Sequence, residues 1–228
     1  MTYELFIGDY AYSSWSLRGW LLFRHLGVDP TLHLVDFTKG SVAEQLPDVA
    51  PARTVPAMRT PEGTMVWDSF AMAEELHDRH PDGGLWPTDP AARALGRSLA
   101  AEMHSGFSSL RGECPMNLRT AYVNVPLSDA TKADIARIEK LWGNAREQYA
   151  DRGPWLLGGY SIADIAFAPV AARFAGYDVA LSQDSQAYVN LHLEDTKFRE
   201  WRSVALTTGE TLPWYAKTFD TKPWPGPA

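Results

Sequence analysis

Residues 10–18 read Tyr-Ala-Tyr-Ser-Ser-Trp-Ser-Leu-Arg, and this stretch decides the fold because a strand ends before it and a helix begins within it. The strand is predicted over residues 3–7, a run of aromatic, leucine and β-branched residues that a polar turn ends. The helix is predicted over residues 17–26, and Gly27 closes it. Its Trp-Leu-Leu-Phe run makes an apolar face too wide for a surface helix, so we expect this helix to lie against a sheet.

Three hydroxyl groups, those of Ser13, Ser14 and Ser16, lie at this helix start. The first N–H groups of a helix have no partner inside it and carry partial positive charge, so they stabilise an anion beside them. The serines are therefore predicted either to hold a thiolate, a phosphate or a carboxylate or, as the simpler interpretation, to cap the helix.

The next part of the chain continues the same structural unit. The predicted elements are a strand over 31–37, a short helix over 42–46, an antiparallel hairpin over 55–59 and 64–67, and a helix over 70–80. Ser69 is the expected N-cap of the last helix, with Asp68 just outside it. Pro56 enters a strand, where a trans peptide bond is the simpler expectation and a cis bond is the alternative. This order predicts one four-stranded mixed sheet with helices.

The pattern changes over residues 81–90, after which we expect helices and no strand. Helices are predicted over 91–111, 128–149, 162–175, 185–192 and 196–205. The fold class is therefore α/β followed by all-α, with an amino-terminal unit over 1–81, a linker over 82–90 and an all-helical unit over 91–228. Ser161 and Asp164 form an expected capping box, and the aromatic tail is expected to pack back on the surface.

Composition excludes several classes of function. The chain has 228 residues, a net charge of −7 and no basic block, so nucleic-acid binding is not expected. It has no apolar run long enough to span a bilayer and lacks the pattern of a signal peptide, so we expect a cytoplasmic protein without membrane contact. The single Cys114 can form no internal disulfide, and the scattered histidines suggest no metal site.

Taken together, these features resemble the cytosolic glutathione transferase family, in which a thioredoxin-like domain precedes a helical domain. The stretch Ser13-Ser14-Trp15-Ser16-Leu17-Arg18 is similar to the Ser-Ser-Cys-Ser-Trp-Arg stretch of the zeta class, whose members include maleylacetoacetate isomerases. Glu102-Met103-His104 is similar to the Asp/Glu-Ile-His stretch of their helical domain. The sequence departs from this class where Trp15 replaces the cysteine.

The resemblance implies a role for individual residues. Ser13 would activate the glutathione thiol, with Ser14 as the first alternative and Tyr10 or Tyr12 after it. The expected glutathione-binding residues are Ser13, Lys39, Thr54, Val55, Pro56, Asp68 and Ser69. Among them Val55 would bind the cysteinyl backbone, a cis Pro56 would follow it, and Asp68 with Ser69 would hold the γ-glutamyl group. The expected residues of the electrophile pocket are Tyr12, Trp15, His104, Phe107, Arg111 and Met116.

The resemblance therefore implies a glutathione S-transferase of the detoxification type, which conjugates glutathione to a small electrophile or isomerises it. A homodimer is expected from the family, with glutathione as co-substrate and no metal. Two alternatives stay open, a glutathione-dependent peroxidase or reductase and a binding or interaction protein without turnover. The sequence leaves the natural electrophile open.

Overall fold

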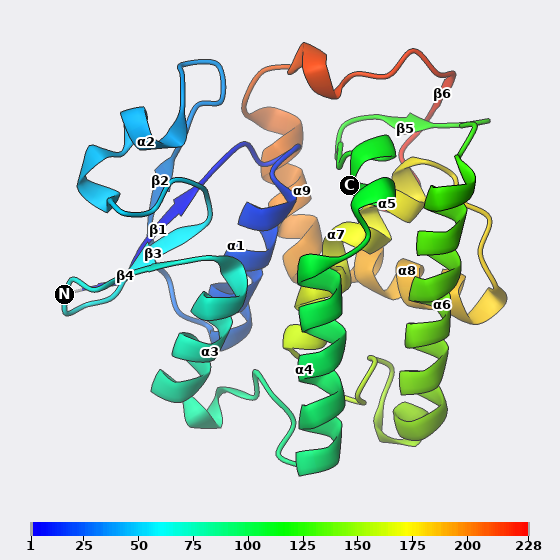
Figure 1. The fold of residues 1–228 in the computed structure, drawn as a ribbon, viewed down its shortest axis with the longest axis horizontal. Coiled ribbons are helices and arrows are strands. Elements are labelled where there is room, and N and C mark those ends of the chain that lie inside the picture. Colours follow the sequence, from blue (N-terminus) through cyan, green and yellow to red (C-terminus); the bar gives the residue numbers. More distant parts are fainter. Residues whose placement is uncertain (1, 228) are drawn as a thin grey trace.

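The computed structural model describes residues 2–227, in which a mixed sheet with helices packs beside a group of longer helices (Figure 1). The first half contains β1 (Glu4–Ile7), α1 (Ser14–Leu26), β2 (Thr31–Leu34), α2 (Val42–Gln45), β3 (Ala57–Arg59), β4 (Met65–Trp67) and α3 (Ser69–Arg79). The sheet has the order β2-β1-β3-β4, with β1 parallel to β2 and antiparallel to β3, and β3 antiparallel to β4. The predicted four-stranded mixed sheet is confirmed.

Helix α1 begins three residues before its predicted start, because Ser13 is its N-cap and the serine-rich turn already belongs to it. Leu17, Leu21 and Phe23 are completely buried, as expected for a helix that lies against the sheet. Gly27 ends the helix with φ +67, a left-handed conformation that glycine adopts without strain.

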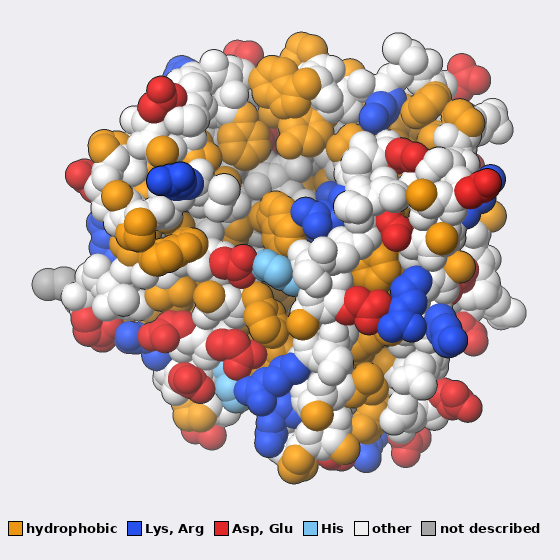
Figure 2. All heavy atoms as spheres, viewed as in Figure 1, with side chains coloured by type: hydrophobic (Ala, Val, Ile, Leu, Met, Phe, Trp, Pro, Cys, Tyr) orange, Lys and Arg blue, Asp and Glu red, His pale blue; other side chains and the backbone are white. Residues whose placement is uncertain are grey.

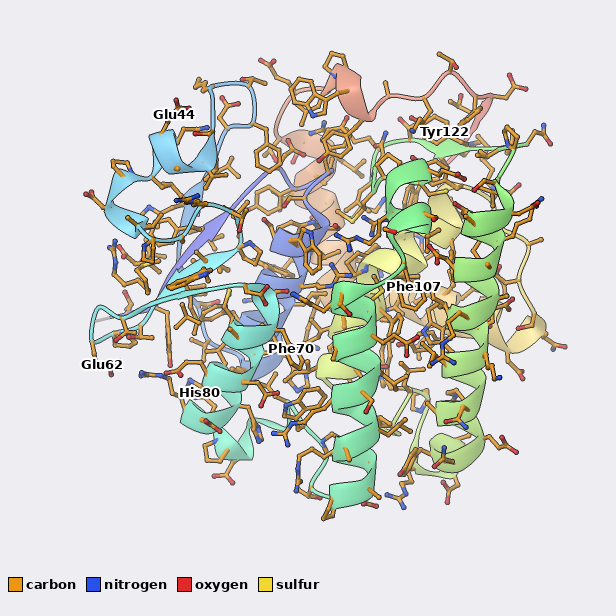
Figure 3. All side chains as sticks on the ribbon, viewed as in Figure 1. Glu44, Glu62, Phe70, His80, Phe107 and Tyr122 are labelled. Atoms are coloured by element: carbon orange, nitrogen blue, oxygen red, sulfur yellow. The ribbon has the colours of Figure 1, made fainter. Side chains whose placement is uncertain are left out.

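The second half contains α4 (Pro90–Ser105), α5 (Ser108–Glu113), α6 (Asp129–Tyr149), α7 (Ile162–Gly176), α8 (Gln183–Glu194) and α9 (Thr196–Thr207), and short 3₁₀ turns lie at Pro47–Val49, Pro81–Gly83, Ala150–Arg152 and Pro213–Tyr215. The single helix predicted over 91–111 is wrong. Gly106 leaves the helical conformation, and Phe107 has φ +59 at the start of α5 (Figure 3).

The expectation that no strand follows residue 90 is also wrong. β5 (Ala121–Tyr122) pairs antiparallel with β6 (Thr221–Lys222), although each strand has two residues and thus no readable alternation. This pairing fastens the carboxyl-terminal tail, which runs along one edge of the molecule (Figure 1). Tyr215 and Trp224 of the tail pack against the apolar core, as predicted.

Helix α7 lies at the centre of the second half, and all of its residues are buried. The predicted capping box is confirmed, since the Ser161 side chain accepts a hydrogen bond from the helix and Asp164 accepts from the Ser161 N–H. The Asp164 carboxylate also accepts from the Leu156 N–H and the Tyr188 hydroxyl. Burial raises the pKa of Asp164 to about 6, against the lowering effect of these hydrogen bonds.

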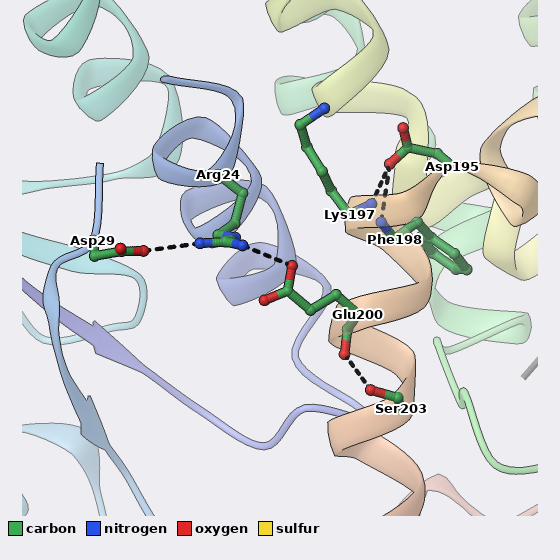
Figure 4. A network of polar contacts seen from close by, with 7 residues as sticks. All are labelled: Arg24, Asp29, Asp195, Lys197, Phe198, Glu200 and Ser203. Atoms are coloured by element: carbon green, nitrogen blue, oxygen red, sulfur yellow. Dashed lines mark hydrogen bonds and ion pairs between the residues drawn. The ribbon is translucent and has the colours of Figure 1, made fainter. Parts of the chain in front are cut away.

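The two halves share one apolar core, to which α1 and α7 both contribute buried side chains. Figure 4 shows a polar link between them, in which Arg24 of α1 forms ion pairs with Asp29 and with Glu200 of α9. This core includes residues of the expected linker and does not divide the chain there. The domain boundary at 82–90 therefore stays a prediction. No helix within residues 2–227 is long and apolar enough to cross a membrane.

Candidate functional site

Hydrogen bonds to Asp9 fix the conformation of the turn between β1 and α1. Its carboxylate accepts hydrogen bonds from the N–H groups of Ala11 and Tyr12 at 2.7 and 3.2 Å. The carbonyl of Asp9 accepts from the Ser13 N–H at 2.9 Å. The turn therefore delivers Ser13 and Ser14 to the first turn of α1 in a fixed orientation, beside N–H groups that favour an anion.

The two serines have different hydrogen-bond partners. The Ser13 hydroxyl lies 2.7 Å from the Ser16 hydroxyl and accepts from the Ser16 N–H at 3.3 Å, so Ser13 caps the helix. The Ser14 hydroxyl accepts a hydrogen bond from Nη2 of Arg173 at 3.1 Å. The capping interpretation thus holds for Ser13, whereas Ser14 contacts a cation from the other half of the molecule.

The Val55–Pro56 peptide bond is cis, as the resemblance implied and contrary to the simpler trans expectation. Pro56 packs against α1 so closely that a Cβ on Gly19 would lie 2.7 Å from its ring, which explains the glycine there. Val55 lies at the end of this turn, before β3. Within residues 2–227 the backbone N–H and C=O of Val55 have no hydrogen-bond partner, so both are free to bind an extended ligand.

Asp68, and not Ser69 as expected, is the N-cap of α3. Its carboxylate accepts from the Phe70 N–H at 2.8 Å, and its backbone has φ +79, a conformation unusual for a residue with a side chain. The same carboxylate lies 3.0 Å from Nε2 of His104, which comes from α4 of the other half. Ser69 is then the first helical residue, with 6% of its surface exposed.

A cavity of about 340 Å³ lies beside the start of α1, between the two halves. Figure 2 shows the hollow on this face, bordered by hydrophobic side chains and by cationic ones. Its lining residues are Tyr12, Ser13, Ser14, Trp15, Phe37, Val42, Thr54, Val55, Arg111, Pro115, Met116, Arg173 and Tyr215. A smaller neighbouring cavity includes Ser69, His104 and Arg18 in its lining. Most of the predicted site residues therefore come together here.

Four of the predicted glutathione-binding and pocket residues do not line these cavities. Asp68 lies beside the smaller cavity through its contact with His104. Lys39 is largely exposed and forms an ion pair with Asp36 at 3.1 Å. Phe107 is 7% exposed and packs in the apolar core. Pro56 is buried behind Val55 rather than at the cavity surface.

Aromatic rings and guanidinium groups line part of this cavity. The Tyr12 ring stacks on Tyr215 with centroids 4.8 Å apart. The Trp15 ring has the guanidinium of Arg18 at 4.4 Å and that of Arg111 at 4.9 Å, an arrangement that favours cation–π attraction. This region suits a flat or apolar molecule that tolerates nearby positive charge.

Sequence reasoning missed Arg173, which lines the cavity from α7. It is 4% exposed, and burial lowers its pKa to about 10 with a further contribution from the charge of Arg111. The available signal was that Arg173 and Asp164 are the charged residues of the otherwise apolar segment 162–176. Tyr215 was also missed, because its approach to Tyr12 depends on the path of the tail.

Two comparisons show what this sequence is similar to. Residues 12–79 match the family model described as the glutathione S-transferase N-terminal domain. A probable maleylacetoacetate isomerase from Caenorhabditis elegans is 32% identical over 97 residues, which are 42% of this chain and 44% of that protein. The chain thus matches less than half the length of this curated relative.

Two solved structures of the same fold cover most of the chain. A glutathione transferase homologue from Burkholderia GL BGR1, with bound glutathione, has a TM-score of 0.69 and 23% identity over 91% of this chain and 100% of that one. The glutathione transferase Omega 3C from Trametes versicolor has a TM-score of 0.67 and 20% identity over 89% of each chain. At these identities the likeness establishes the fold.

Proposed function

We propose that this chain, whose amino-terminal domain belongs to the glutathione S-transferase family, activates the thiol of glutathione with a serine hydroxyl for attack on a small electrophile. The observation that carries the proposal is that Ser13, Ser14 and Val55 line one cavity at the start of α1. A sulfur placed there would meet a hydroxyl donor and the positive end of a helix.

The energy needed for thiol activation is within reach of these groups. A free cysteine thiol has a pKa of about 8.5, so lowering it by about two units requires roughly 2.7 kcal/mol of preference for the thiolate. A hydrogen bond to a charged group supplies roughly 1.5–3 kcal/mol and a helix N-terminus roughly 0.3–1 kcal/mol. One serine hydroxyl at the start of α1 is therefore sufficient without a general base.

The remainder of glutathione would bind along the edge of the first half. The free N–H and C=O of Val55 suit the cysteinyl backbone, as one strand binds another. The γ-glutamyl carboxylate would lie at the start of α3 beside Ser69, and its ammonium beside Asp68. Thr54 lines the same cavity. Lys39 would take part by leaving its ion pair with Asp36.

The electrophile would occupy the aromatic part of the cavity, formed by Tyr12, Trp15, Arg111 and Met116. His104 contacts this region through its ring, whose centroid lies 5.0 Å from the centroid of the Trp15 ring. Isomerisation is included in the proposal because the curated relative is a probable maleylacetoacetate isomerase. Phe107 packs in the core, and its expected role in the pocket stays a prediction.

Calorimetric titration with reduced glutathione tests the proposal. We expect the wild-type protein to bind it, and Ser69→Ala to bind at least about tenfold more weakly, since a hydrogen bond to a charged carboxylate is lost. Ser128→Ala is the matched control, because Ser128 caps α6 away from the cavity. No binding by the wild-type protein would refute the function, and binding without turnover on a panel of electrophiles would favour a binding protein.

We also propose that the protein is a cytoplasmic homodimer, as the family resemblance implies. Light scattering coupled to size-exclusion chromatography measures the mass in solution directly. A mass equal to one chain of 25.4 kDa would contradict the dimer.

A further inference from the structure

The hydroxyl of Ser13 is engaged inside the protein. It contacts the Ser16 hydroxyl at 2.7 Å and the Ser16 N–H at 3.3 Å, and Ser16 in turn accepts from the Gly8 N–H at 2.9 Å. These contacts tie the start of α1 to the end of β1. The Ser13 hydroxyl therefore has two partners inside the protein, both of them on Ser16.

The hydroxyl of Ser14 has the opposite arrangement. It accepts from Nη2 of Arg173 at 3.1 Å, and within residues 2–227 its hydroxyl proton has no acceptor. A hydroxyl that accepts a hydrogen bond from a cation becomes a stronger donor, since hydrogen bonds in a chain polarise one another. Ser14 lines the cavity, so its free proton is available to an anion there.

Arg173 is held firmly in this position by the backbone. Its Nε donates to the carbonyl of Cys114 at 3.0 Å and its Nη1 to the carbonyl of Pro169 at 3.2 Å. Among residues 2–227 it has no carboxylate in an ion pair. Burial lowers the pKa of Arg173, and the nearby cation of Arg111 lowers it further.

A buried guanidinium that has hydrogen bonds but no counter-ion lacks part of its electrostatic stabilisation. Arg18 and Arg111 add positive charge nearby: besides burial, the charges of Arg173 and Arg111 both lower the pKa of Arg18, and the charge of Arg111 lowers the pKa of Arg173. This region of the cavity is therefore prepared for negative charge. A glutathione thiolate at the start of α1 would supply it.

We propose that Ser14, oriented and polarised by Arg173, is the hydroxyl that donates to the glutathione thiolate, and that Ser13 serves as the helix cap. The inference rests on the proposed function and assigns Arg173 as a positioning residue. No covalent bond forms at the protein: the thiol proton leaves to solvent, Ser14 keeps its own proton, and the guanidinium balances the new charge.

The thiolate absorbance of bound glutathione, measured in the ultraviolet as a function of pH, tests this assignment. We expect Ser14→Ala and Arg173→Gln each to raise the pKa of the bound thiol by about one to two units. Arg173→Lys, which keeps the charge, should restore part of the shift. Since Arg173 acts through Ser14, the effect of Arg173→Gln should be smaller in the Ser14→Ala background.

Two further variants separate a specific role from a structural one. Arg202→Gln is the matched control, because Arg202 is equally buried and donates to backbone carbonyls but lies outside the cavity lining. It should lower the melting temperature and leave the thiol pKa unchanged. Ser13→Ala should lose the helix cap with a thiol pKa close to wild type. If Arg173→Gln does not fold, Ser14→Ala and Arg173→Lys carry the test.

The outcomes distinguish the two proposals. A thiol pKa that rises in Ser13→Ala and stays at the wild-type value in Ser14→Ala would overturn the assignment and leave the transferase function intact. The assignment would also be overturned if the changes in thiol pKa caused by Ser14→Ala and Arg173→Gln were fully additive in the double variant. A wild-type protein that binds no glutathione would overturn both.

Discussion

The pKa of the buried Asp164 carboxylate depends on two opposing effects, burial and hydrogen bonding, and their sum can be measured. Its Oδ1 accepts from the Leu156 N–H at 3.0 Å and the Tyr188 hydroxyl at 2.8 Å, and its Oδ2 accepts from Ser161. Hydrogen bonds to a carboxylate lower its pKa and burial raises it. Burial has the larger effect, so the pKa of Asp164 is raised to about 6 from its usual 3.8.

This shift has a definite consequence for stability. Because the folded protein binds the proton more tightly than the unfolded chain, the contribution of Asp164 is fully present below pH 4 and is lost as pH rises through 6. A pKa raised from 3.8 to about 6 corresponds to about 3 kcal/mol of unfolding free energy. Asp164→Asn removes the titrating group and keeps an acceptor at Oδ1.

The experiment is urea unfolding of wild type and Asp164→Asn at intervals between pH 4 and pH 8. We expect the difference in unfolding free energy, wild type minus variant, to decrease by about 2 to 2.5 kcal/mol over this range, because the unfolded carboxyl is already partly ionised at pH 4. Asp89→Asn is the matched control, since Asp89 also caps a helix but its pKa is lowered, chiefly by its hydrogen bond to Arg152. For Asp89, the difference in unfolding free energy between wild type and variant should increase with pH, because the stability that Asp89 contributes is lost as pH falls. A difference for Asp164 that grows with pH would mean that its four hydrogen bonds outweigh burial.

Three other substitutions have expected outcomes. Gly19→Ala places a Cβ 2.7 Å from Pro56, so the free energy of unfolding should fall by about 1–3 kcal/mol in urea titrations, and an unchanged midpoint would contradict the contact. Burial raises the pKa of Cys114 to about 12, so the folded protein should resist iodoacetamide at pH 8. The Cys114→Ala variant should keep the turnover of the wild type. Rapid labelling of Cys114 without denaturant would contradict this burial. Tyr215→Ala removes the ring stacked on Tyr12 and should raise the KM for the electrophile about two- to tenfold with the same Kd for glutathione, whereas a weaker glutathione affinity alone would argue against the assignment.

Much of the fold could be predicted because its signals are local. The strand before Gly8 and the closing Gly27 delimit the first strand and helix, and the capping box at Ser161 follows from a serine and an acid at fixed spacing. The break at Gly106 was missed, because helix-forming residues continue on both sides of it. The two-residue strands could not be predicted, since their pairing joins segments about a hundred residues apart.

The candidate site was predictable where chemistry and chain position coincide. Ser13, Ser14 and Val55 stand next to turns that the sequence reveals, and all three line the cavity. The exchange of roles between Asp68 and Ser69 was not readable, because it depends on the positive φ of Asp68. The ion pair of Lys39 with Asp36 depends on the shape of an exposed turn.

Arg173 shows why the rest needed the structure. A charged residue in an apolar helix must satisfy its hydrogen bonds inside the protein, and the sequence cannot tell which partners it has. Asp164, on the same helix, accepts hydrogen bonds from four donors in its own half. Arg173 donates to two backbone carbonyls and, through Nη2, to the Ser14 hydroxyl. One helix thus carries an acid whose hydrogen-bond partners all lie within the fold and a cation that lacks a counter-ion beside the cavity, and this difference assigns a structural role to Asp164 and a role in ligand binding to Arg173.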